Sequence, residues 1–123
     1  MTQRVIDCLA NVHFGETENQ PTFMKKVRDD YFKGPKSLYD PIDLGQLLDE
    51  MDTHGVQRAV LMDSLAKPSV TARTFVEAHP DRFSLAMGGV NLLRPIPSLR
   101  ELQAISKDLP VVYTVVGPSF WGD

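Results

Sequence analysis

The sequence predicts an α/β fold in which about four parallel strands are covered by helices. Short apolar runs alternate with segments of helical periodicity, and the connections between them are short. Two of the expected strands, residues 59–62 and 111–116, are almost entirely apolar, as is typical of strands buried on both faces. The chain has 42% hydrophobic and 24% charged residues, and its net charge of −3 gives no reason to expect nucleic acid or an anionic membrane as partner.

The first expected strand is apolar and runs straight into polar positions. A side-chain period of two places Asp7, Leu9, Asn11 and His13 on one face of this strand. Cys8 falls on the other face, inside the apolar run. Because it is the only cysteine, no internal disulfide can form, and we expect a reduced, buried thiol.

The next segment, residues 15–40, is polar and irregular and is interpreted as an insertion above the sheet, with a short helix over residues 22–32. The clearest helix follows. Its expected start is Asp40-Pro41, with Asp40 as the capping residue, and its apolar residues recur at helical spacing up to Met51. His54-Gly55 supplies a stop signal at its end.

Strands and helices then alternate to the end of the chain. A strand is expected over residues 56–62, a helix that Lys67-Pro68-Ser69 opens and that runs to about Ala78, and a third strand over residues 82–90. Ser98-x-x-Glu101 is a capping-box pattern that predicts the start of the last helix, which Leu109-Pro110 ends. Residues 111–116 form the fourth strand.

Ligands of parallel α/β sheets bind at the carboxyl ends of the strands, so the residues that follow each strand are the candidates for function. The glycine-rich phosphate loop, the nucleophile elbow and paired Cys-x-x-Cys ligands are all missing from the sequence. The polar and aromatic candidates at the strand ends are Asn11, His13, Asp63, Ser64, Asn91, Ser119, Phe120 and Trp121.

Three blocks of the chain stand out in combination. They are Ile6-Asp7-Cys8 followed by His13-Phe14, the block Leu47-Leu48-Asp49-Glu50-Met51-Asp52-x-x-Gly55-Val56-x-Arg58-Ala59-Val60-Leu61, and His79-Pro80-Asp81-Arg82-Phe83. Together they resemble the amidohydrolase-related family, which consists of metal-dependent (β/α)8 barrels and includes hydrolases and decarboxylases of the aminocarboxymuconate-semialdehyde type. Residues 115–122 resemble the family's strand-to-loop segment at the catalytic mouth.

The resemblance covers nearly the whole chain and implies the N-terminal half of a (β/α)8 TIM-type barrel. A complete barrel has roughly 250 residues, about twice the 123 present, so residues 1–123 are interpreted as one incomplete domain. The implied activity is that of a metal-dependent hydrolase or carbon–carbon lyase (decarboxylase), acting on a small carboxylate or cyclic substrate. The implied cofactor is a divalent metal, zinc or manganese.

The chain departs from the family at the His-x-His pair that supplies metal ligands at the end of the first strand. Leu9 and Asn11 stand at those two positions. Leucine cannot ligate, and an amide oxygen is a weak ligand for a transition metal. The family's further histidine ligand and its catalytic aspartate lie in the later half of the barrel. We therefore expect the isolated chain to be inactive.

Each candidate residue keeps a functional and a structural interpretation. His13 is a candidate general base or metal ligand, or else a loop histidine bonded to backbone. Asp7 is a candidate metal carboxylate, or it bonds neighbouring amides. Asn11 and Asn91 are candidates for binding substrate. Ser119, Phe120 and Trp121 would line the substrate pocket, or they form an exposed chain end.

The expected surroundings follow from the same observations. No segment has the apolar length of a secretory signal or a membrane span, so a cytoplasmic protein is expected. Half a barrel leaves strand edges uncovered, which predicts self-association. The second hypothesis is a non-catalytic α/β module that binds a small ligand or a partner at the same strand ends.

Overall fold

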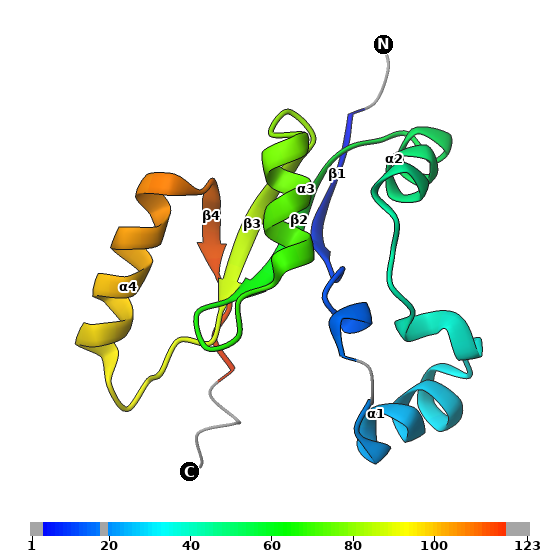
Figure 1. Ribbon diagram of the computed structural model, residues 1–123, viewed down its shortest axis with the longest axis horizontal. Coiled ribbons are helices and arrows are strands. Elements are labelled where there is room, and N and C mark those ends of the chain that lie inside the picture. The colour runs from blue at the N-terminus through cyan, green and yellow to red at the C-terminus, as the bar shows by residue number, and fades with distance from the viewer. Residues whose placement is uncertain (1–3, 18–19, 118–123) are drawn as a thin grey trace.

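The structure is a computed structural model that describes residues 4–17 and 20–117. Its strands form one parallel sheet in the order β1-β2-β3-β4, which is also their order in the chain. The bounds are Val5–Ala10 for β1, Val56–Ser64 for β2, Phe83–Gly88 for β3 and Val111–Thr114 for β4. The predicted α/β class with four parallel strands is confirmed (Figure 1).

Helices connect the strands on one side of the sheet. Because the strand order never reverses and such crossovers are right-handed, successive connections lie on the same face. The connections are α2 (Leu44–Thr53), α3 (Val70–Ala78) and α4 (Pro95–Asp108). Between β1 and α2 the predicted insertion forms the helical segment α1 (Thr22–Lys26), which continues directly into the π-helical turn η2 (Val27–Phe32), and the short 3-10 turns η1 (Phe14–Glu16) and η3 (Lys36–Tyr39). Within the described ranges, no helix is long and apolar enough to cross a membrane.

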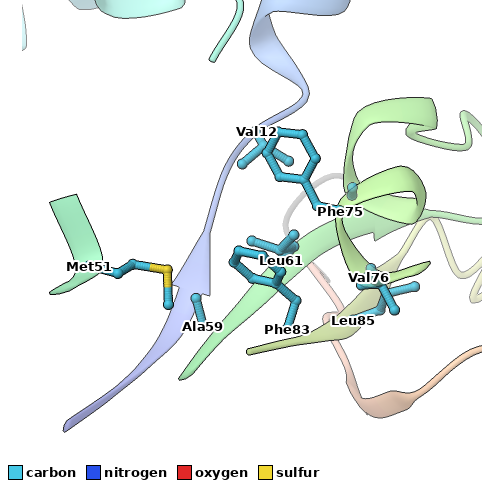
Figure 2. Packing of buried hydrophobic residues seen from close by; sticks show 9 residues of the cluster. Val12, Met51, Ala59, Leu61, Phe75, Val76, Phe83 and Leu85 are labelled. Atoms are coloured by element: carbon cyan, nitrogen blue, oxygen red, sulfur yellow. The ribbon is translucent and has the colours of Figure 1, made fainter. Parts of the chain in front are cut away.

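The core lies between the sheet and helices α2 and α3. Figure 2 shows Phe75 of α3 above Leu61 and Phe83 of the sheet, while Met51 of α2 points toward the other end of the cluster. Leu61, Phe83 and Leu85 are 0% exposed, and the rings of Phe75 and Phe83 lie 6.0 Å apart. Burial of these apolar side chains is the main force that holds α3 on the sheet.

In the part of the chain that the structure describes, the opposite face of the sheet carries no helix, yet part of this face is buried. Ser84 and Ala86 alternate with the core residues of β3 and are 6% and 0% exposed. Tyr113 of β4 donates its hydroxyl hydrogen to the carbonyl oxygen of Cys8 in β1. In a flat sheet β1 and β4 would lie three strand spacings of about 4.8 Å apart, which is farther than a tyrosine side chain reaches. The sheet must therefore curve toward this face.

The expected alternation in β1 fails in its middle. Asp7 is in register with Ala59 and Ala10 with Leu61, so three steps along β1 match two along β2. This bulge places Asp7 and Ala10 on the same face, where a strict period of two would separate them. Cys8, expected to be buried, is exposed because β1 is an edge strand with no neighbour on its outer side.

The fourth strand also differs from expectation. Its apolar sequence predicted burial on both faces, but Val112 is 56% and Tyr113 37% exposed. As the other edge of the sheet, β4 has only β3 beside it. The apolar character of β4 is therefore not matched by burial within the described residues.

The predicted starts of two helices, α2 and α4, are wrong. Helix α2 begins at Leu44, and its capping residue is Asp43, whose side chain accepts a hydrogen bond from the Gln46 amide at 3.1 Å. Asp40 instead ends the preceding turn η3. The expected start of α3 is confirmed, since Ser69 accepts from the Ala72 amide at 3.1 Å.

Helix α4 begins earlier than the capping-box pattern predicted. It starts at Pro95, a residue suited to the first turn because it has no amide hydrogen to leave unpaired. Ser98 therefore lies inside the helix, where it is 5% exposed and accepts a hydrogen bond from the Asn91 amide at 3.0 Å. The serine fixes the loop before the helix and does not cap the helix itself.

Candidate functional site

His13 lies three residues after the end of β1, immediately before η1, and is half-buried. Burial lowers the pKa of its imidazole below the usual value of 6.5, and the positive charge of Lys67 acts in the same direction. The negative charges of Glu16 and Asp63 oppose this shift without cancelling it. At neutral pH the ring is therefore mainly neutral, which is the form that can accept a proton.

Glu16 connects this turn to the beginning of α3. Its Oε1 accepts hydrogen bonds from the Ser69 hydroxyl at 2.9 Å and from the Thr71 amide at 2.7 Å. Burial acts to raise the pKa of Glu16, but the hydrogen bonds from Thr71 and Ser69 outweigh it and leave that pKa below its usual value. A carboxylate at this position also complements the positive end of the helix dipole.

Asp63 is the most buried acidic group near the strand ends. Its Oδ1 accepts from the Ser64 and Ser69 amides, both at 2.7 Å, and its Oδ2 lies 2.7 Å from Nε of Arg73. The Asp63 side chain is fully buried, while that of Arg73 is 28% exposed. All these contacts hold the loop from β2 to α3, so Asp63 acts here as a structural carboxylate.

The resulting cluster consists of His13, Glu16, Asp63, Lys67 and Arg73. Lys67 Nζ donates to the Thr17 hydroxyl at 3.4 Å, which adds a further contact between the two loops. Both carboxylates of the cluster are already engaged in hydrogen bonds, so the imidazole of His13, whose pKa is lowered by burial, is the group left to accept a proton. The arrangement can therefore exchange a proton through His13.

The donor set does not by itself fit a metal. Asp7 accepts a hydrogen bond from the Leu9 amide at 3.0 Å, which is the local backbone interaction considered as its structural alternative. The carboxylates that lie close enough to His13 to affect the pKa of its imidazole are those of Glu16 and Asp63. Across residues 4–17 and 20–117, no three histidine, cysteine or acidic side chains come together as a possible metal site. No chemical step is accordingly assigned to a metal.

The predicted substrate-binding amides lie in different places. Asn11 lines a cavity of about 390 Å³ between the exit of β1 and the start of α2, together with Phe14 and Gln46. Asn91 lines a separate cavity of about 240 Å³ after β3, and its Oδ1 accepts from the Leu93 amide at 2.9 Å. Ser119, Phe120 and Trp121 lie outside the described residues.

Three members of the cluster were not candidates from the sequence. Glu16, Lys67 and Arg73 belong to no recognised motif, and Glu16 meets Ser69 across 53 positions of the chain. The only local sequence signal for these contacts was Ser69, at the start of a helix. The positive end of the helix dipole lies there and favours an acidic side chain nearby.

Comparisons of the chain with protein-family models, with curated proteins and with solved structures find no match. The resemblance to the amidohydrolase-related family consequently stays a prediction based on the quoted residues.

Proposed function

We propose that the chain is the first half of an amidohydrolase-related (β/α)8 barrel and that it contributes part of a small-molecule site at the carboxyl ends of its strands. The observation that carries this proposal is the sheet itself. Its strands are parallel and stand in chain order, and Tyr113 of β4 reaches Cys8 of β1 across the face without helices. A closed barrel needs this combination of order and curvature.

The position of His13 supports the second part of the proposal. It follows the carboxyl end of β1, the edge of the sheet where ligands of such folds bind. A neutral imidazole there can take a proton from a substrate or from water. Asn11, two residues earlier, would orient a substrate through its amide.

The chain alone is expected to be catalytically inactive. Hydrolysis or decarboxylation in the proposed class depends on a divalent metal that polarises the substrate or activates water. The described residues supply no group of three metal ligands, so the remaining ligands would have to come from strands that complete the barrel.

The experiment combines metal analysis with turnover assays. The purified chain is incubated with zinc or manganese, its bound metal is measured, and hydrolysis and decarboxylation of small cyclic carboxylates are followed. We expect no turnover and no stoichiometric metal. Metal-stimulated turnover by a monomer would contradict the proposed half-barrel.

The second candidate is a non-catalytic α/β module that binds a small ligand. It is favoured by the engagement of Glu16 and Asp63 in loop contacts, since these carboxylates are used to hold structure. Ligand binding that persists in the metal-free chain after addition of a chelator would favour this module. Binding that requires added metal would favour the enzyme half.

A further inference from the structure

The insertion between β1 and α2 forms a third cavity, whose lining differs from that of the two described above. It measures about 470 Å³, which lies within the usual range of roughly 300–1,000 Å³ for small-molecule pockets. It shares some of its wall with the cavity of about 390 Å³ described above. The residues that line it are Asn11, Phe14, Met24, Val27, Phe32, Gly34, Leu38 and Tyr39.

The chemistry of this lining is almost uniform. Among the described residues that line it, Asn11 is the only amide, and none is a lysine, arginine, aspartate or glutamate. Phe14, Phe32 and Tyr39 supply aromatic surface, with the rings of Phe14 and Tyr39 5.2 Å apart and tilted by 58°. An ionised ligand would lose its hydration here without a compensating charge, whereas an uncharged ring can pack edge or face against these side chains.

Local contacts hold the walls of the cavity. The Tyr39 hydroxyl donates to the Met24 carbonyl at 3.1 Å and so joins η3 to α1. The Gly34 amide donates to the Arg28 carbonyl at 3.0 Å and closes the end of η2. Since the Tyr39 hydroxyl is already used, Asn11 is the side chain left to make a polar contact with a ligand.

We propose that this cavity is a binding site for an uncharged aromatic molecule of one or two rings that carries one hydrogen-bonding group. An apolar cavity of about 150 Å³ is enough for benzene, so one of about 470 Å³ accommodates a substituted or fused ring. The ring lies against Phe14, Phe32 and Leu38, and its polar group meets the Asn11 amide. The described residues that line the site all lie between Asn11 and Tyr39, so the site does not depend on completion of a barrel.

The test uses the whole 123-residue chain, labelled with nitrogen-15, and p-cresol as the probe. Amide resonances of Phe14, Gly34 and Leu38 are expected to shift and to saturate, with a dissociation constant on the order of 1 mM for so small a ligand. Benzoate, a charged ring of similar size, is expected to bind at least roughly tenfold more weakly.

Three variants locate the site. Leu38→Trp fills the cavity and is expected to weaken p-cresol binding by roughly tenfold or more. Asn11→Ala removes the polar contact and is expected to weaken it by about fivefold, the equivalent of one ordinary hydrogen bond. Leu99→Trp, at a 54% exposed position of α4, is the matched control and should leave binding unchanged.

Phe32→Ala tests the same site without depending on correct folding of Leu38→Trp. Its side chain is 61% exposed, so the substitution perturbs packing little while it removes one wall of the cavity and weakens binding. Absence of saturable shifts with p-cresol would overturn the proposal. Equal affinity of wild type, Leu38→Trp and Phe32→Ala would overturn it as well, and so would shifts that map to the sheet edges.

Discussion

The buried carboxylate of Asp63 is the residue on which the loop between β2 and α3 depends most. It receives two backbone amides and the Arg73 guanidinium, and Nη2 of Arg73 is itself buried without a hydrogen-bond partner in the described part of the chain. The guanidinium therefore relies on Asp63 to balance its charge. Removing one member of such a pair leaves the other uncompensated.

Asp63→Asn is accordingly expected to lower the free energy of unfolding by roughly 2–4 kcal/mol, because charge-assisted hydrogen bonds are lost and Arg73 loses its counter-ion. Urea unfolding followed by circular dichroism measures the change. Asp49→Asn, at an exposed position of α2, is the matched control. A loss equal to that of the control would show that the Asp63 contacts carry no stability.

His13 predicts a dependence of stability on pH. Its pKa in the folded chain is below the unfolded value of 6.5, so the unfolded state binds more protons in the interval between the two values. The free energy of unfolding therefore falls as the pH drops through and below 6.5 toward the folded pKa, and is restored above 6.5.

His13→Gln removes this contribution. We expect the change in unfolding free energy between about pH 7.5 and about pH 5.5 to be smaller in this variant than in the wild type. Both pH values lie above the range in which Glu16, with its lowered pKa, would titrate. His54→Gln, which removes an exposed imidazole at the end of α2, is the control. Identical pH profiles for wild type and His13→Gln would contradict the assignment.

At the scale of elements, helix α2 has two aspartates near its start, and Asp43 caps it while Asp40 does not. Asp43→Ala is expected to cost about 1 kcal/mol of stability, because the Gln46 amide loses its acceptor. Asp40→Ala, three residues earlier, is expected to change stability by less than about 0.5 kcal/mol. Urea unfolding of the two variants under the same conditions decides the point, and a larger loss for Asp40→Ala would contradict the observed start of the helix.

The elements themselves were predictable where a local pattern decides them. The spacing of apolar residues before Met51 predicted the body of α2, though not its start, and Lys67-Pro68-Ser69 predicted the start of α3, since both signals act within one or two turns. The start of α4 was missed because Pro95 and Ser98 each suit a first turn, and the loop contact of Ser98 with Asn91 depends on folding. The edge positions of β1 and β4, and with them the exposure of Cys8, depend on strand order, which periodicity does not report.

The candidate site was predictable only in part for the same reason. His13 and Asp63 were candidates from the sequence because they lie at the ends of strands, and the topology of parallel sheets makes such positions functional candidates. Glu16, Lys67 and Arg73 join the cluster through contacts between loops that are distant in sequence. The apolar cavity of the insertion was also missed, because its residues show no periodicity along the chain.

At the scale of the whole molecule, the two edges of the sheet expose apolar side chains. Val5, Ile6 and Leu9 of β1 are 42%, 53% and 51% exposed, and Val112 of β4 is 56% exposed. Strand edges with apolar side chains are templates for pairing with another chain. We propose that β4 of one copy pairs with β1 of the next, which would continue the strand order around a barrel.

Light scattering coupled to size-exclusion chromatography tests this central claim most directly. The proposed half-barrel predicts a mass at least twice the 13.8 kDa of one chain. Val112→Lys, which places a charge on the β4 edge, should shift the mass toward that of the monomer, whereas Val70→Lys, at a 74% exposed position of α3, should not. A wild-type chain that elutes as a 13.8 kDa monomer at every concentration would contradict the account.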